Sequence, residues 1–292
     1  MSSLESVPAG SFSLPAWDKD YPDPQKLRRE AEIAGDAFVQ ALTEMVPDAE
    51  LAAVYLKGST VKVWTTPLDY VPALSDVDIH VLFADDTQAD AYYRDVEQAL
   101  RLAGRAEDIF LAATPQRLHV PRVQIVVANR LYRMPDFVPA PRETVRLIRG
   151  TYPPAPATGS GIPVLKEQLL QHAEYLERLG ESVADLLGPH LRVALRAMSW
   201  RVSPAAPRVA ELLGEPFVTV WSSNRTALVE LLTQRGEAEL AADYAAYYLQ
   251  AWRYFLSGDQ DSTAARAAIR AGVRVIERGA ELAGTVQDQE PD

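Results

Sequence analysis

The sequence predicts an α+β protein in which a mixed sheet with helices is followed by an all-helical region. Three observations indicate this class. Short apolar runs with strand periodicity occur only in the first half of the 292-residue chain. The Pro- and Gly-rich stretch "RGTYPPAPATGSGIP" then interrupts the pattern. Beyond it, apolar residues recur at helical spacing. We therefore expect an extended arm at 1–24, an α/β region at 25–150, a linker at 151–163, a helical region at 164–284 and a loose tail at 285–292.

In the first half, the elements follow from their local signals. "DPQKLRREAEIAGDAFVQALTEMV" has Pro24 at its start and apolar residues at helical spacing, which predicts a helix. Four strands are expected at "LAAVYLKG", "SDVDIHVLFA", "DIFLAAT" and "RVQIVVANR". A short helix is expected at "TVKVW". A longer helix is expected at "DDTQADAYYRDVEQALRLAG", with Asp86 as its N-cap and Gly104 as its end.

In the second half, only helices are expected. Their predicted ranges are 164–187, 189–203, 205–214, 216–235, 236–257 and 262–284. The fifth range carries an aromatic group at helical spacing, and we interpret it as core rather than as a stacking surface for substrate. Its members are Tyr244, Tyr247, Tyr248, Trp252, Tyr254 and Phe255.

The composition restricts the classes of function. The chain has a net charge of −11, so it lacks the overall basic footprint that phosphate contacts require, and a nucleic-acid partner is not expected. It has no Cys, which excludes disulfides, thiolate nucleophiles and Cys-type zinc sites. No apolar run is long enough to span a membrane, and the N-terminus does not resemble a signal peptide. We expect a cytoplasmic location, and no oligomeric state is predicted.

Two acids stand in the apolar strand "SDVDIHVLFA". Side chains alternate along a strand, so Asp76, Asp78 and His80 share one face. The two carboxylates are about 7 Å apart at roughly 3.3 Å of rise per residue. Neighbouring acids repel each other unless a positive group lies between them, and Mg²⁺ is a natural partner for such a pair. His80 is a candidate contact to the bound molecule, although a hydrogen-bonded sheet histidine is the preferred interpretation.

The Gly58–Ser59 pair supplies a second feature of the same stretch. It follows a strand and precedes the predicted helix "TVKVW". A glycine turn before a helix lets a phosphate approach free backbone N–H groups. Lys57 or Lys62 adds a full positive charge. Gly58, Ser59 and Lys62 are therefore the predicted triphosphate-binding residues, complementary to the metal site at Asp76 and Asp78.

"LKGS" followed by "SDVDIHV" resembles the signature of the DNA polymerase β-type nucleotidyltransferase superfamily, over roughly residues 50–130. The helical second half is similar to that of aminoglycoside and other small-molecule nucleotidyltransferases. The resemblance implies that Asp76 and Asp78 are catalytic and bind two Mg²⁺ ions with a nucleoside triphosphate, with ATP as the expected one. It also implies that Gly58 and Ser59 hold the phosphates.

Two features depart from the pattern. The spacer between Ser59 and Asp76 is long, and "TTPLDYVPA" within it is interpreted as an added loop. The resemblance also implies a third carboxylate on a later strand, but Gln124 occupies the matching position of "RVQIVVANR". An amide oxygen can coordinate a metal but cannot take a proton as a base. Asp69, Asp108 and Glu143 are the candidates for a substitute.

The expected function is an enzyme that transfers a nucleoside monophosphate from Mg–NTP to a hydroxyl of a small molecule. The acidic chain suits a cationic, aminoglycoside-like acceptor. The alternative is a catalytically weak or inactive nucleotide-binding protein of the same fold, antitoxin-like or a sensor. An RNA-end or tRNA nucleotidyltransferase is disfavoured by the charge.

Three more histidines and one arginine complete the candidates. His119, His172 and His190 have no ligand-like spacing and are expected at the surface or in caps. Arg225 is a candidate phosphate contact, although an ion pair between helices is the default expectation.

Overall fold

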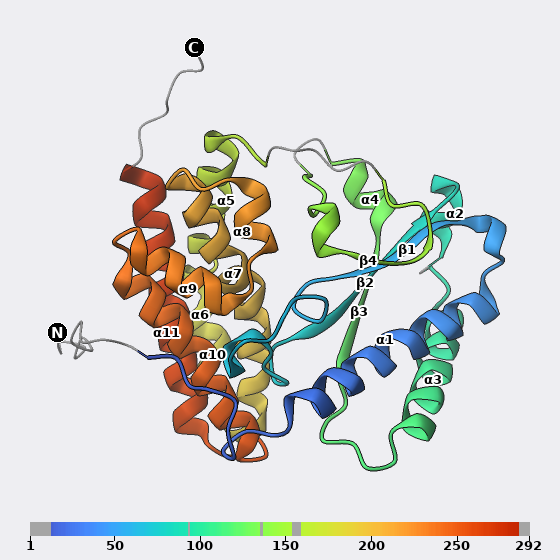
Figure 1. Ribbon diagram of the computed structural model, residues 1–292, viewed down its shortest axis with the longest axis horizontal. Helices are drawn as coiled ribbons and strands as arrows, with labels where there is room; N and C mark the ends of the chain where they lie inside the picture. Colours follow the sequence, from blue (N-terminus) through green and yellow to red (C-terminus); the bar gives the residue numbers. More distant parts are fainter. Residues whose placement is uncertain (1–12, 93, 135–136, 154–158, 286–292) are drawn as a thin grey trace.

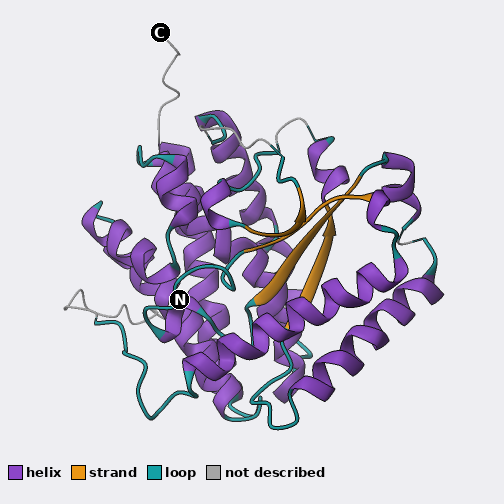
Figure 2. Cartoon of the chain, turned by 45° about the vertical axis from the view of Figure 1, so that its right-hand side comes forward, coloured by secondary structure: helices purple, strands orange, loops and turns teal. Residues whose placement is uncertain are grey.

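A computed structural model describes residues 13–92, 94–134, 137–153 and 159–285. It confirms the α+β class: a mixed four-stranded sheet with helices is followed by a helical region (Figures 1 and 2). The strands are β1 (Leu51–Lys57), β2 (Asp76–Phe83), β3 (Arg122–Val127) and β4 (Arg146–Gly150). Their order in the sheet is β3-β2-β1-β4. β2 pairs parallel to β3, whereas β1 pairs antiparallel to both β2 and β4.

One face of the sheet is covered by two helices, α1 (Pro24–Met45) and α3 (Val96–Ala113) (Figure 1). α1 begins as predicted, with Pro24 in its first turn and the Asp23 side chain accepting a hydrogen bond from the Gln25 N–H. The buried side chains of β2 that face this layer are Val77, Ile79, Val81 and Phe83. Asp76 and Asp78 therefore lie on the opposite face, as the alternation predicted.

Three local predictions in this half are wrong. The expected helix at 85–104 is divided into α2 (Asp86–Ala91), whose N-cap is Asp85, and α3, whose N-cap is Asp95. α3 continues through the exposed Gly104 and includes the expected strand "DIFLAAT", because Leu102, Ala106 and Phe110 keep a four-residue spacing on its buried face. The expected helix at 60–64 is a turn. The edge strand β4 was not predicted, because it has no alternating pattern of burial.

The helical region has two helices close to their predicted bounds and several that differ. Its helices are α5 (Ile162–Glu174), α6 (Leu176–Val183), α7 (Leu191–Leu212), α8 (Phe217–Ser222), α9 (Arg225–Gln234), α10 (Ala238–Leu256) and α11 (Ser262–Thr285). The predicted breaks at 203–205 are absent, since α7 passes through Pro204 and Pro207. Buried residues on both sides of these prolines anchor α7 in the core, and this packing offsets the missing N–H donors. Asn224, in contrast, caps α9 and divides the range 216–235.

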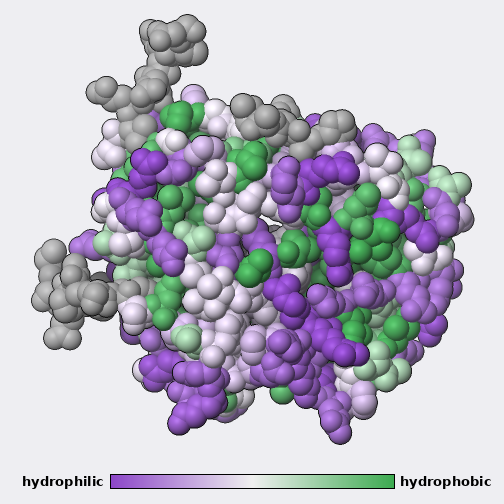
Figure 3. Space-filling view, viewed as in Figure 1, coloured by the Kyte–Doolittle hydropathy of each residue, from purple (hydrophilic) through white to green (hydrophobic). Residues whose placement is uncertain are grey.

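The remaining elements are short: α4 (Ala128–Tyr132) and the 3-10 turns η1 (Asp48–Glu50), η2 (Pro67–Asp69), η3 (Arg142–Thr144) and η4 (Gly188–His190). None of the helices among the described residues is both long and apolar enough to cross a membrane. Figure 3 shows hydrophilic and hydrophobic side chains interspersed over one face of the molecule. The aromatic group of α10 is core, as predicted, with Tyr244, Tyr247, Tyr248, Trp252 and Tyr254 buried.

The long loop between β1 and β2 joins the sheet to the helices. Leu68, Val71 and Leu74 are buried in the same core as the helical region. The Trp252 indole N–H donates to the Pro67 carbonyl at 2.7 Å, and the Asn224 side-chain amide donates to the Val63 carbonyl at 3.0 Å. The added loop predicted from the sequence is therefore a buried connection rather than a surface insertion. The described part of the N-terminal arm also packs here, with Trp17 and Tyr21 edge-on to the Trp252 ring.

Candidate functional site

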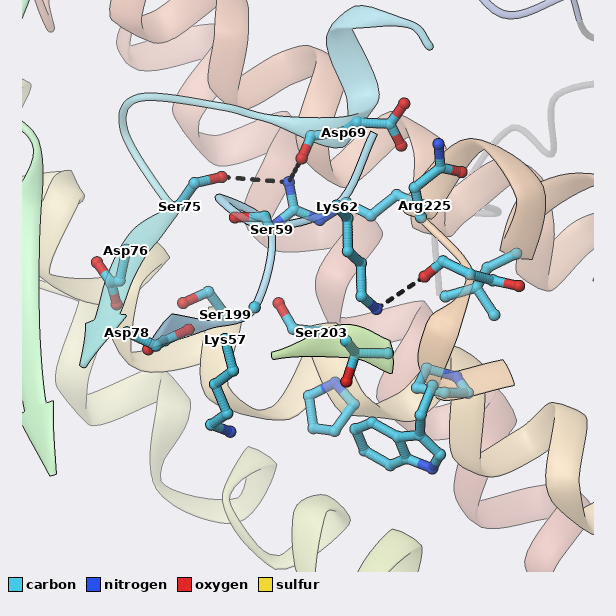
Figure 4. A pocket seen from close by; sticks show the side chains of 18 of the residues that line it. Lys57, Ser59, Lys62, Asp69, Ser75, Asp76, Asp78, Ser199, Ser203 and Arg225 are labelled. Atoms are coloured by element: carbon cyan, nitrogen blue, oxygen red, sulfur yellow. Dashed lines mark hydrogen bonds between the residues drawn. The ribbon is translucent and has the colours of Figure 1, made fainter. Parts of the chain in front are cut away.

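A cavity of about 400 Å³ lies where β1 ends and β2 begins, against the helical region. The sheet and the long loop contribute Lys57, Gly58, Ser59, Lys62, Asp69, Ser75, Asp76, Asp78 and Gln124. The helices contribute Ser199, Trp200, Ser203, Pro204, Pro207, Trp221, Ser223, Asn224, Arg225, Leu228 and Tyr244. Figure 4 shows Asp76 and Asp78 at one end of this cavity, with Lys62 and Arg225 toward the helices. The structure thus brings together most of the residues singled out in the sequence.

The Asp76 carboxylate forms ion pairs with two arginines. Its carboxylate accepts a hydrogen bond from Arg122 Nη1 at 2.8 Å and another from Arg196 Nη1 at 3.1 Å. Arg122 is its register neighbour on β3, and Arg196 comes from α7. The Asp76 side chain is only 10% exposed, so these two guanidiniums supply the positive charge that such a buried carboxylate requires.

Asp78 is in the opposite situation. Within the described residues its carboxylate takes part in no recorded hydrogen bond, although it lines the cavity. Burial raises its pKa to about 6, and the charge of the neighbouring Lys57 only partly opposes this rise. Its Oδ2 lies 2.3 Å from the point where a Cβ on Gly58 would stand. Asp78 is therefore an acceptor-rich group that no donor among the described residues satisfies, and it packs against the glycine turn.

No third carboxylate joins this pair in the described part of the chain, where no group of three acidic or histidine side chains is placed to hold a metal. Asp108 is exposed on α3 and Glu143 is exposed on η3, and neither lines the cavity. Asp69 does line it, but its oxygens accept hydrogen bonds from the Thr65, Thr66 and Thr226 N–H groups and the Thr226 hydroxyl at 2.7–3.1 Å. Asp69 thus caps η2 and fastens it to α9.

Gln124 stands where the third acid was expected. In the parallel pairing of β2 with β3 it is directly opposite Asp78, and it lines the cavity. The structure therefore places the Gln124 side chain beside the Asp78 carboxylate at the cavity. A carboxylate there would be adjacent to Asp78, whereas the amide offers one neutral oxygen and two N–H donors.

The Gly58–Ser59 turn has the glycine geometry but not the predicted helix. Gly58 has φ +83°, a left-handed conformation that glycine adopts without strain. The Val61 N–H donates to the Gly58 carbonyl at 3.3 Å, and a turn rather than a helix follows. Free N–H groups at a helix start are therefore not the basis of any phosphate site here.

Two lysines lie beside the turn in the cavity. Lys62 Nζ donates to the Ser223 carbonyl at 2.8 Å (Figure 4). Burial, together with the nearby charges of Arg225 and Lys57, lowers the Lys62 pKa to about 8. Lys57 pairs with Asp78 in the β1–β2 register, and among the described residues its side-chain ammonium makes no hydrogen bond.

Arg225 and His80 have structural partners. Arg225 is not part of an ion pair between helices: its Nη1 donates to the Leu68 carbonyl at 3.0 Å and to Ser75 Oγ at 3.2 Å, and its guanidinium lies over the Tyr248 ring. It therefore ties the long loop to the helices at the cavity wall (Figure 4). His80 is buried outside the cavity lining, with Nδ1 3.3 Å from the Tyr55 hydroxyl, and burial lowers its pKa to about 3. The preferred sequence interpretation of His80 as a sheet histidine agrees with this position.

Two arginines at the site, Arg122 and Arg196, were not predicted from the sequence, and one histidine lies elsewhere than predicted. Arg122 shares the alternation of Gln124, so its position beside Asp76 was available from the strand pattern. Arg196 gave no local signal, because only the packing of α7 brings it to β2. His119 was expected at the surface but is buried; His172 is half-buried, and His190 is exposed as expected.

No protein-family model matches the chain, and comparisons with curated proteins and with solved structures give no match.

Proposed function

We propose that the cavity binds a Mg²⁺–nucleoside triphosphate, with ATP as the first candidate, and that the protein transfers its nucleoside monophosphate to a small-molecule hydroxyl. The observation that carries the proposal is Asp78. A mostly buried carboxylate with a raised pKa, and with no donor in the part of the chain that the structure describes, is costly for the fold unless a cation satisfies it. The adjacent Gly58–Ser59 turn and two lysines provide space and positive charge for phosphates.

A metal fits this site in part. Asp78 would hold Mg²⁺, and the Gln124 amide oxygen would be its second protein ligand. Asp76 would join only by releasing Arg122 or Arg196. The metal would supply charge stabilisation on the phosphate oxygens.

Side chains of this protein would bind the phosphates and orient the acceptor. Lys57 and Lys62 neutralise phosphate charge, and the cavity walls orient the acceptor hydroxyl. The oxygen of the acceptor hydroxyl forms a bond to the α-phosphorus of the triphosphate. The bond between the α-phosphorus and the oxygen that bridges it to the β-phosphorus breaks, and pyrophosphate leaves. The hydroxyl proton passes to water.

The residues of the helical wall of the cavity indicate which class of acceptor fits there. Among the lining residues, this wall carries hydroxyls and aromatic rings, including Ser199, Ser203 and the 57%-exposed Trp200, and no carboxylate. A cationic acceptor would need acidic partners there. The wall therefore favours an uncharged, hydroxyl-bearing ring over the aminoglycoside-like acceptor suggested by the net charge.

A second candidate is nucleotide binding without transfer, as in a sensor. Two observations favour it: Gln124 takes the place of a possible base beside Asp78, and two arginines already hold Asp76. The proposal of transfer and this alternative share the same bound nucleotide.

The test is to measure Mg–ATP binding by calorimetry and transfer with α-labelled ATP. Under the proposal, wild type binds Mg–ATP and gives labelled product, and Gln124→Glu raises Mg²⁺ affinity by adding a carboxylate. Binding without product in wild type, but product with Gln124→Glu, favours the second candidate. No binding of Mg–ATP by wild type refutes both.

A further inference from the structure

A chain of buried polar and aromatic contacts leads away from the glycine turn to the far side of the sheet. It begins at Trp64, whose indole N–H donates to the Ser59 carbonyl at 2.8 Å. The indole stacks on Tyr70, with ring centroids 4.2 Å apart and an interplanar angle of 16°. Tyr70 is fully buried, so the stacking partner of the indole is itself immobilised by the core.

The Tyr70 hydroxyl is held by a buried histidine and glutamate. It lies 2.8 Å from His119 Nε2, and His119 Nδ1 lies 2.7 Å from Glu30 Oε2. The side chains of His119 and Glu30 are each only 4% exposed. The other Glu30 oxygen accepts from the Leu118 N–H at 2.7 Å, which ties the segment before β3 to α1.

The donors and acceptors in this chain form one consistent set. The Glu30 oxygens accept from the backbone N–H groups of Leu118 and His119, so the carboxyl group is an acceptor here and the His119 proton is on Nδ1. Burial lowers the His119 pKa despite the nearby Glu30, which keeps the ring neutral and leaves Nε2 to accept from the Tyr70 hydroxyl. Every member therefore has a partner, and such a satisfied buried network is rigid.

A second group on α1 acts on the same turn. Arg28 Nη2 donates to the Lys62 carbonyl at 2.7 Å and Nη1 to the Thr60 carbonyl at 3.4 Å, and its guanidinium lies over the Trp64 ring. The carbonyls of Ser59, Thr60 and Lys62 thus all have side-chain donors. Because a trans peptide points its N–H away from its C=O, fixing the Ser59 carbonyl also fixes the direction of the Thr60 N–H.

We propose that Trp64 is a positioning residue for the Gly58–Ser59 turn, and that the Tyr70–His119–Glu30 relay holds Trp64 in place. The proposal rests on the proposed function in one respect, that this turn contacts the phosphates. Trp64 does not line the cavity, so it acts on the bound nucleotide only through the turn.

The chain offers a matched control in Trp252. Its indole N–H also donates to a backbone carbonyl of the same loop, that of Pro67 at 2.7 Å, but at η2 rather than at the turn. Trp64→Phe and Trp252→Phe each remove one such N–H and keep an aromatic ring. Tyr70→Phe removes the relay hydroxyl while it keeps the stacking ring, and serves as a second variant should Trp64→Phe not fold.

The experiment measures hydrogen exchange of the peptide covering residues 55–62 and the Kd of Mg–ATP in each variant. We expect Trp64→Phe to speed exchange in this peptide and to weaken Mg–ATP binding about tenfold, the equivalent of one hydrogen bond. Tyr70→Phe should act in the same direction. Trp252→Phe should leave both readouts within about twofold of wild type, because its hydrogen bond is made at η2 and not at the turn.

Unchanged exchange in both Trp64→Phe and Tyr70→Phe would overturn the positioning role, and so would an equal effect of Trp252→Phe. If wild type does not bind Mg–ATP, the proposed function fails, but exchange at the turn still decides the positioning role. If exchange rises while Mg–ATP binding is unchanged, the turn does not contact the phosphates, and the link to nucleotide binding is refuted.

Discussion

Replacement of Asp78 by Asn should make the unliganded protein more stable at neutral pH. In the native state, burial raises the Asp78 pKa from 3.8 to about 6. The carboxylate is protonated more readily in the folded than in the unfolded state, so native stability falls as pH rises through this window. Above pH 6 the Asp78 carboxylate is ionised in both states, and the native state is destabilised by the full amount. About two pKa units at 1.36 kcal/mol each correspond to about 3 kcal/mol.

Asn is neutral at every pH and avoids this penalty. We expect the free energy of unfolding of Asp78→Asn to exceed that of wild type by up to about 3 kcal/mol at pH 8 and by about half as much at pH 5. The gain should vanish below pH 3.8, where both states of Asp78 are protonated. Urea unfolding followed by tryptophan fluorescence at several pH values gives the difference directly.

Asp76→Asn is the matched control, because it should have the opposite sign. It leaves Arg122 and Arg196 without their carboxylate and should lower the free energy of unfolding by about 2 kcal/mol. The reasoning would be refuted if Asp78→Asn destabilised the protein at pH 8, or if its effect did not depend on pH. Under the proposed function, the more stable Asp78→Asn variant should also fail to bind Mg–ATP.

Two more predictions concern the cavity walls. Gly58→Ala should lower the free energy of unfolding by about 2–3 kcal/mol, since it adds a contact with Asp78 to the cost of a left-handed alanine. Gly236→Ala, with a similar φ of +86° and open space, should cost only about 1 kcal/mol, and equal losses in denaturation would contradict the steric argument. Arg225→Lys should lower the melting temperature by several degrees through loss of its fork of hydrogen bonds and its stacking on Tyr248. Arg253→Lys on α10 is the control, because among the described residues the Arg253 side chain makes no contact that the change would remove. It should leave the melting temperature within about a degree, since such surface changes cost almost nothing.

Predictions from the sequence were accurate where the interactions are local in the chain, and less accurate where they are long-range. Strand alternation placed Asp76 and Asp78 on one face, because side chains along a strand keep a strict two-residue period. The register that puts Gln124 opposite Asp78 came from the structure. Helix bounds were less accurate. Pro204 looked like a break, yet core packing carries α7 past it, and "DIFLAAT" looked like a strand although its apolar residues continue a helix face.

The sequence by itself determined the α+β class, the strand that carries the two acids and the glycine turn beside them. These depend on local periodicity and backbone preference, which neighbouring residues carry. Only the tertiary structure decided which acid is paired with arginines. Arg196 reaches Asp76 from a helix 120 residues away in the chain, while Asp69 caps η2 and accepts from the Thr226 N–H of α9. Charge compensation acts through space, so the difference between Asp76 and Asp78 became visible only after the helices had packed against the sheet.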